Sequence, residues 1–201
     1  MPRGIPLTKV ERERVRRRIF GIASRLFLRQ GFHETSMRQI AKAAGMGKAT
    51  IYDYFPRKEE IPLYFVEKMM EVTHVAAAEI SQRALPAPQK LRLIMKSLWG
   101  YLTENRGMAL LVAKESSRLG EDGTRRLAAR RRRYRAILER IIRQGIKEGT
   151  LRAVNPGLAA SSLHSMMTVP FYDWLLRRSS GGHAAGPEDL TEIFLRGVAA
   201  K

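Results

Sequence analysis

The segment from Thr35 to Glu60 constrains the fold of this chain more than any other. Ser36 precedes Gln39 by three residues, which is the spacing of a capping box at the start of a helix. Gly45 predicts the end of that helix, because glycine readily takes the left-handed conformation that closes one. Between these signals, apolar residues recur at helical spacing on one narrow face, at Met37, Ile40, Ala41 and Ala44.

A second short helix is expected over residues 48–55, after a three-residue turn that begins at Gly45. Its residues Ile51 and Phe55 fall on the inner side, so the other side chains remain outward. Two short helices joined by such a turn form a helix-turn-helix, whose second helix lies in the major groove of DNA. The outward candidates for contact are Lys48, Thr50, Tyr52 and Tyr54.

The charge of the chain agrees with an anionic partner. The formal net charge is +18 and the pI is about 11.0, which favours nucleic acid first and an anionic membrane second. The excess is concentrated in residues 1–58, which hold fourteen Lys and Arg against four Asp and Glu. No apolar run approaches the ~20 residues that span a bilayer, and no apolar segment follows the basic start, so we expect no secretory signal and no membrane partner. The absence of cysteine excludes disulfides and thiolate metal sites and fits the cytoplasm.

Helical periodicity predicts an all-α fold. A three-helix head should be joined through a fourth helix to a C-terminal bundle, with a DNA-binding domain over residues 13–73 and an effector-binding and dimerisation domain over residues 74–201. A loop is expected over residues 178–186, which are rich in Ser and Gly. Outside the helix-turn-helix, helices are expected at residues 9–30, 58–83, 88–104, 107–119, 123–147, 156–178 and 187–199.

Residues 22–61 resemble the TetR family of bacterial transcriptional regulators, whereas the rest of the chain resembles it only in length and helical pattern. The resemblance implies a homodimeric, sequence-specific DNA-binding regulator, in the first place a repressor that a small apolar or aromatic ligand releases from a palindromic operator. Activation, and function without a ligand, remain open. The residues that carry the resemblance are Ala23, Leu26, Phe27, Gly31, Phe32, Thr35, Ile40, Ala41, Ala44, Gly45, Thr50, Ile51, Tyr52, Tyr54, Phe55, Lys58, Glu59, Glu60 and Ile61.

Side-chain chemistry and the resemblance together assign the DNA contacts. Lys48 suits a phosphate or a guanine edge, and Arg38 suits a base or a phosphate. Tyr52 and Tyr54 suit DNA contact or inward packing, and Lys58 resembles a phosphate clamp. A solvated lysine is the alternative for Lys48. The full set of candidates is Thr35, Ser36, Arg38, Lys48, Ala49, Thr50, Tyr52, Tyr54 and Lys58.

Two arginine clusters allow several interpretations. The basic arm, which we define as the arginines of residues 12–18, suits the minor groove or phosphates, or else a solvated helix face. The arginines of residues 125–135 are too many for one side of a helix. They suit solvent, acidic residues elsewhere, an anionic effector or a wider electrostatic footprint on DNA.

The C-terminal bundle offers an effector pocket and a dimer interface, both implied by the resemblance. Soft and aromatic side chains suit an adaptable apolar pocket, although each also suits a plain core. The pocket candidates are Met95, Trp99, Met108, His164, Met167, Phe171 and Trp174. The interface candidates are Leu163, Leu175, Leu176, Ile193, Phe194 and Val198.

Two rival classes follow from the same sequence. A non-specific architectural or RNA-binding protein would explain the charge, and a helical-bundle enzyme would explain an apolar pocket. The four histidines are scattered, and the sequence has no phosphate-binding loop or nucleophile elbow. We therefore expect no enzyme, no cofactor and no metal.

Overall fold

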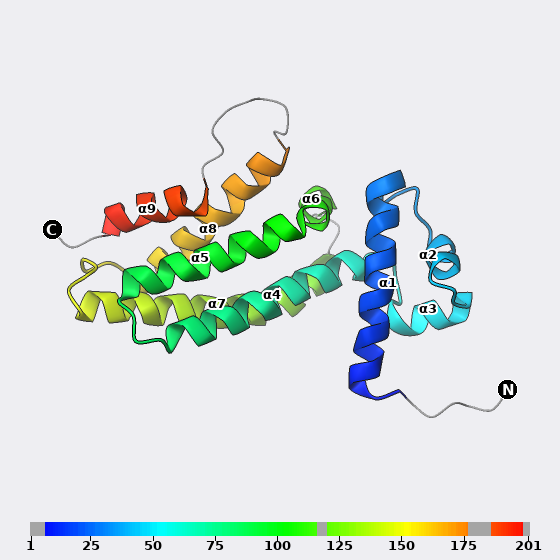
Figure 1. The fold of residues 1–201 in the computed structure, drawn as a ribbon, viewed down its shortest axis with the longest axis horizontal. Helices are drawn as coiled ribbons and strands as arrows, with labels where there is room; N and C mark the ends of the chain where they lie inside the picture. The colour runs from blue at the N-terminus through cyan, green and yellow to red at the C-terminus, as the bar shows by residue number, and fades with distance from the viewer. Residues whose placement is uncertain (1–6, 116–119, 177–185, 199–201) are drawn as a thin grey trace.

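A computed structural model describes residues 7–115, 120–176 and 186–198, and for residues 113–115, 120–124 and 167–176 it describes only the backbone. Within these ranges the fold is all-α, as predicted, and none of the described helices is long and apolar enough to cross a membrane. Figure 1 shows a small head beside an elongated bundle. The helices are α1 (Lys9–Gln30), α2 (Met37–Ala43), α3 (Lys48–Tyr54), α4 (Glu60–Ser81), α5 (Ala87–Glu104), α6 (Arg106–Glu115), α7 (Gly120–Lys147), α8 (Pro156–Leu176) and α9 (Pro187–Val198).

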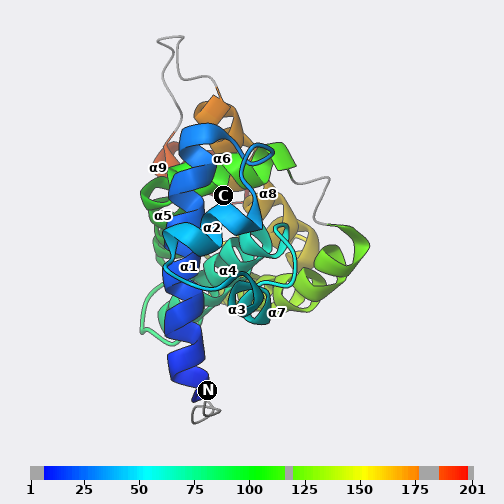
Figure 2. The same cartoon turned by 90° about the vertical axis from the view of Figure 1, so that its right-hand side faces the viewer.

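The head consists of α1, α2 and α3, and its local signals act as the sequence predicts. The capping box at the start of α2 is present, with Gln39 N–H donating to Ser36 Oγ over 3.2 Å. Gly45 follows α2 with a φ of 64°, the left-handed conformation that a side chain would strain. Figure 2 shows the head facing the viewer, with α1 standing across the end of the bundle. A core of fully buried side chains joins the three helices, formed by Ile19, Ala23, Ile40, Ile51 and Phe55.

Helix α4 leads from the head into the bundle (Figure 1). It begins at Glu60, so Pro62 occupies the third helical position, where a missing N–H costs no helical hydrogen bond. The predicted domain boundary at residues 73 and 74 falls inside this continuous helix. The boundary therefore stays a prediction.

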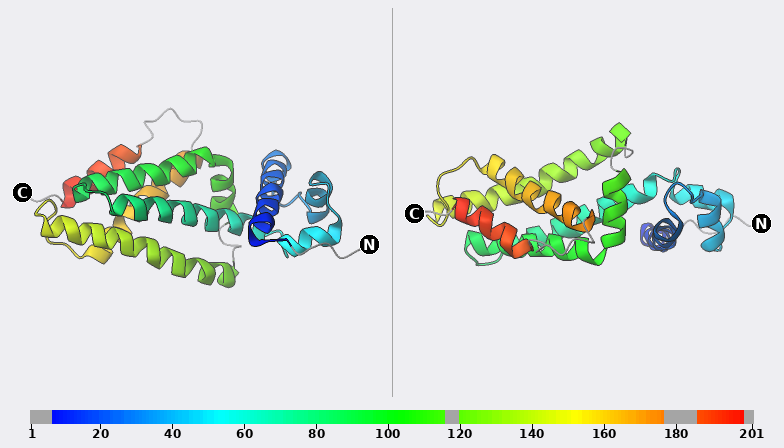
Figure 3. Two further views of the ribbon diagram at one scale, coloured as in Figure 1. Left: turned by 60° about the horizontal axis from the view of Figure 1, so that its bottom comes forward. Right: turned by 90° about the horizontal axis from the view of Figure 1, so that it is seen from above.

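The bundle contains α4 to α9, as the two views of Figure 3 show. Its centre is apolar, and Leu91, Met95 and Leu138 are fully buried there. Near one end, a Cβ added to Gly145 of α7 would lie 2.8 Å from Ala87 Cβ, so glycine permits the close approach of α5 and α7. Helices α6 and α7 correspond to the predicted helices at 107–119 and 123–147. Residues 178–185 of the predicted loop lie outside the described residues.

Candidate nucleic-acid interface

Helix α3 presents one buried side and one exposed side. Ile51 of α3 and Phe55, which follows it, are fully buried in the head. The opposite side chains are exposed, including Tyr52 at 40%. The exposed residues of this helix that were predicted to contact DNA are Lys48, Ala49, Thr50 and Tyr52. The hydrophobic core thus fixes which groups α3 offers to a groove.

The start of α2 adds two more predicted residues. Ser36 and Arg38 are both exposed. The Ser36 hydroxyl is engaged with Gln39, since it donates to Oε1 over 3.0 Å. Arg38 and Lys48 make no hydrogen bond or ion pair with any residue the structure describes, so both cations are available to an external anion.

Tyr54 lies differently from the other predicted residues of α3. It is half-buried and packs against the head core. The Arg12 guanidinium stands 5.3 Å from its ring centroid and donates a hydrogen bond to the Asp53 carbonyl oxygen. This geometry favours the inward alternative for the ring.

The structure corrects the expectation for Thr35. Its side chain is fully buried. Its hydroxyl donates to the Gly31 carbonyl oxygen over 2.7 Å and accepts from Gln30 Nε2 over 3.1 Å. Both hydrogen-bonding functions of the hydroxyl serve the turn between α1 and α2, so the side chain does not reach a phosphate.

The phosphate clamp at Lys58 stays a prediction, and without DNA its ammonium is engaged inside the head. Its Nζ donates to the carbonyl oxygens of Phe32 over 2.8 Å and Thr35 over 2.9 Å, with a third, longer contact to His33 over 3.3 Å. It also lies 4.5 Å from the centroid of the Phe32 ring. An ammonium has three protons, and all three point into the turn between α1 and α2.

Part of the basic arm is also used inside the head. Arg18 donates to the Ala44 carbonyl oxygen over 3.1 Å, at the end of α2. The Arg16 guanidinium lies 4.9 Å from the Phe55 ring centroid and 4.8 Å from that of Tyr64. Arg14 and Arg17 are exposed. The basic arm is therefore not one unit, because some of its arginines pack inside the head and others face solvent.

Two of the arginines of residues 125–135 link α7 to the first turns of α4. Arg126 contacts the carboxylates of Glu60 and Glu67, each over 2.9 Å. Arg130 donates to the Glu67 carbonyl oxygen over 3.1 Å. Burial alone would raise the pKa of Glu60, but the hydrogen bond and charge of Arg126 outweigh it and lower that pKa. Of the alternatives given for the arginines of residues 125–135, Arg126 takes the pairing with acidic residues.

A second polar link joins α1 to α4. Glu13 of α1 accepts from the Tyr64 hydroxyl over 2.8 Å and pairs with Lys68 Nζ over 2.6 Å. Burial and this hydrogen bond raise the pKa of Tyr64 to about 12. Burial also raises the pKa of Glu13, but the hydrogen bonds from Lys68 and Tyr64 outweigh burial and lower that pKa. This second link holds the head to the helix that enters the bundle, whereas the Arg126 link joins that helix to α7.

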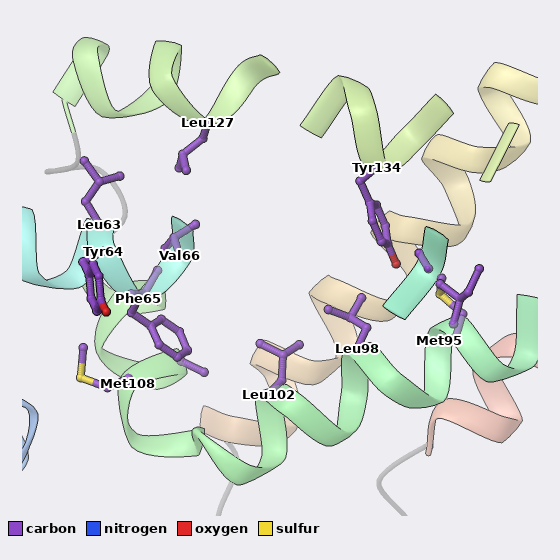
Figure 4. Close-up of a cluster of buried hydrophobic side chains, with 14 of the residues drawn as sticks. Leu63, Tyr64, Phe65, Val66, Met95, Leu98, Leu102, Met108, Leu127 and Tyr134 are labelled. Atoms are coloured by element: carbon purple, nitrogen blue, oxygen red, sulfur yellow. The ribbon is translucent and has the colours of Figure 1, made fainter. Parts of the chain in front are cut away.

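The pocket candidates whose side chains are described are spread along the bundle, and the pocket stays a prediction. Figure 4 places Met95 at the Tyr134 end of a buried cluster and Met108 at the opposite end, near Phe65. Met95 and Met108 are buried, whereas Trp99 and His164 are partly buried. The side chains of Met167, Phe171 and Trp174 lie outside those the structure describes.

Tyr134 is the bundle residue that the sequence reading missed. It lies within the arginine run, and the one signal for its burial is its spacing of seven residues after the buried Leu127. Its ring centroid lies 5.7 Å from that of His164.

Most described residues of the predicted dimer interface pack inside the subunit. Leu163, Phe194 and Val198 are buried in its own core, which corrects their assignment. Ile193 is 61% exposed, and Leu158 on α8, which was not predicted, is 69% exposed. The side chains of Leu175 and Leu176 lie outside the described ones.

Two family models match the chain. Residues 19–63 match the model described as bacterial regulatory proteins, tetR family. Residues 84–198 match the model described as tetracyclin repressor-like, C-terminal domain. Together they cover most of the head, the start of α4 and the bundle from α5 to α9.

Similar proteins agree with these matches. The fatty acid metabolism regulator protein of Bacillus subtilis is 24% identical over 182 residues, which cover 90% of this chain and 93% of the relative. The TetR family regulator PfmR from Thermus thermophilus is 27% identical with a TM-score of 0.71, covering 89% of this chain and 97% of that one. The regulator FadR from Bacillus subtilis, solved in complex with stearoyl-CoA, is 23% identical with a TM-score of 0.75, covering 90% and 98%.

Proposed function

The chain belongs to the TetR family of bacterial regulatory proteins, and from that premise we propose that it is a homodimeric repressor released from a palindromic operator by an acyl-coenzyme A. Membership of this family makes it a transcriptional regulator, and not an enzyme. As a regulator that binds the chromosome, it acts in the cytoplasm.

The exposed side of α3 carries the proposal. Its burial pattern leaves Lys48, Thr50 and Tyr52 toward solvent, on a helix that the head core holds rigidly through Ile51 and Phe55. In a helix-turn-helix this is the helix that enters the major groove. Ser36 and Arg38 at the start of α2 complete the proposed DNA contacts. Ala49 adds a methyl group, which suits a thymine methyl or a close approach of the backbone.

The dimer is proposed through α8 and α9. Leu158 and Ile193 are large apolar side chains that the subunit itself leaves exposed. Covering them with a second copy would remove apolar surface from water. A dimer would also supply two α3 helices, which suits the two half-sites of an inverted repeat.

The ligand class rests on the relatives and on the chemistry of the bundle. One relative is named for fatty acid metabolism and one structural neighbour holds stearoyl-CoA. The cluster in Figure 4 is almost entirely apolar, with Met95, Leu98 and Leu102 among its members. Such a lining suits an acyl chain, and unbranched methionines adapt to different chain shapes.

Selection of bound sequences from a random duplex pool tests the proposed function first. At about 150 mM salt, weak non-specific binding is reduced. We expect an inverted repeat to be enriched, bound by a protein that sediments as a dimer, and stearoyl-CoA to release it. An unenriched pool would instead point to an architectural protein.

Lys48→Ala then tests the contact surface on the selected operator. We expect about tenfold weaker binding, because charged hydrogen bonds to phosphate or guanine are lost. Lys147→Ala removes the same charge at the far end of α7 and serves as the matched control. Fluorescence anisotropy measures both affinities. Equal losses in the two variants would mean that only net charge matters.

A further inference from the structure

The hydroxyl of Tyr134 is buried inside the bundle without a hydrogen-bond partner among the described residues. The side chain is 8% exposed. Figure 4 shows its ring descending from α7, with the oxygen pointing toward α5 near Leu98. Met95 and Leu98, which are apolar and buried, belong to the same cluster.

The other buried hydroxyl groups among the described residues are hydrogen-bonded, which distinguishes them from the hydroxyl of Tyr134. The Thr73 hydroxyl donates to the Met69 carbonyl oxygen over 2.8 Å, and the Thr191 hydroxyl is similarly bonded to Pro187. The buried Lys90 ammonium donates to Ser81 and Gln144, each over 2.9 Å. A buried polar group left unpaired lowers stability, and a phenylalanine would fill the same place without that cost.

We propose that the Tyr134 hydroxyl is the polar anchor of the effector site and donates a hydrogen bond to the acyl carbonyl oxygen of the ligand. This inference rests on the proposed function, in which an acyl-coenzyme A binds in the bundle. The apolar cluster around Met95 and Leu98 holds the acyl chain beside the anchor.

The surroundings favour a neutral carbonyl over a carboxylate. Burial raises the pKa of Tyr134, so the phenol stays protonated and remains a donor. Burial, followed by the charge of Arg131, lowers the pKa of the neighbouring His164, so this ring is held neutral near pH 7. An ionised carboxylate beside these two neutral rings would be costly to bury without a paired cation. A thioester carbonyl needs only the one donor that Tyr134 supplies.

The test compares two ligands on two proteins. The ligands are stearoyl-CoA and its thioether analogue octadecyl-CoA, which lacks only the carbonyl oxygen. We expect the wild-type protein to bind the thioester about tenfold more tightly, and Tyr134→Phe to bind both equally. Tyr101→Phe is the control, because Tyr101 is half-buried and stacks on Phe65, with ring centroids 6.1 Å apart. It should keep the tenfold preference.

The stability of the ligand-free Tyr134→Phe protein gives a second test, in which the substitution should cause no loss. Removing an unsatisfied hydroxyl should leave the ligand-free Tyr134→Phe protein as stable as wild type or raise its melting temperature. A drop in melting temperature would mean that the hydroxyl already has a structural partner, which would overturn the inference.

Calorimetric titrations with stearoyl-CoA, octadecyl-CoA, stearic acid and coenzyme A separate the remaining outcomes. If wild type binds stearoyl-CoA but Tyr134→Phe keeps its thioester preference, the anchor is wrong and the proposed function stands. If stearic acid binds as tightly as stearoyl-CoA, the site accepts a carboxylate, and the proposed preference for a neutral thioester is wrong. If wild type binds none of the acyl ligands, the ligand class and the anchor both fail.

Discussion

The head and the bundle use polar side chains in opposite ways. In the head, cations complete the fold: Lys58 holds the turn between α1 and α2, Arg18 the end of α2, and Arg12 the end of α3. In the bundle, Tyr134 is buried with its hydroxyl unpaired by any described group. In the head these bonds fix the turns that position the exposed side of α3, whereas in the bundle the unpaired hydroxyl is free to bind the ligand that we propose.

The same comparison separates two roles for charge in the head. Lys48 and Arg38 make no polar contact with described residues, while Lys58 is fully engaged with carbonyl oxygens. Lys48 and Arg38 can bind a phosphate in exchange for water, without giving up a contact inside the protein. A positive charge near a DNA-binding surface is therefore no guide to its role until its partners are known.

Phe55→Ala should have the largest effect, because it removes a fully buried ring that packs against Tyr64 and lies under Arg16. We expect a loss of about 3–5 kcal/mol, by the usual cost of truncating a core phenylalanine. If the head is a separate unit, urea unfolding followed by circular dichroism will show two transitions and operator binding will be lost. One transition at lower urea would show that head and bundle unfold together.

Lys58→Met should cost less, about 1–3 kcal/mol, because it leaves carbonyl oxygens of the turn without their charged donor. Lys42→Met, at an exposed site on α2, should have little effect on the same urea midpoint. If both variants are equally stable, the contacts of Lys58 contribute nothing net, and its predicted role as a phosphate contact is favoured.

Acidification should weaken the bundle at His164 before it weakens the ion pairs of α4, with the smallest expected effect on overall stability. His164 has a pKa below its usual 6.5, so below that pH the unfolded chain binds a proton first and stability falls. Glu13 and Glu60 have pKa values below their usual 4.5, so their contribution is complete above that pH and is lost as pH falls through the lowered values.

Urea midpoints measured from pH 7.5 downward, with His164→Gln as the comparison, resolve the two ranges. The variant should lack the loss that begins near pH 6.5 and retain the loss below pH 4.5. An unchanged profile would mean that His164 is not the group responsible.

Local signals made the helices of the head predictable. Capping at Ser36 and the left-handed Gly45 depend on residues close in sequence, and the structure places both as predicted. In the bundle, periodicity predicted the bounds of the helices to within a few residues, but it did not predict which side chains pack against one another. Leu163 and Phe194 were expected at a dimer interface and instead pack inside the subunit.

By itself, therefore, the sequence determined the all-α fold, the helix-turn-helix and the family, because helix caps, glycine turns and apolar spacing act over a few residues. The tertiary structure alone decided which cations are free and which are bound, since Lys58 meets carbonyl groups more than twenty residues away in the chain. It also decided the burial of Tyr134 amid a run of arginines. Those outcomes depend on how whole helices pack, and the spacing of residues along one helix does not contain that information.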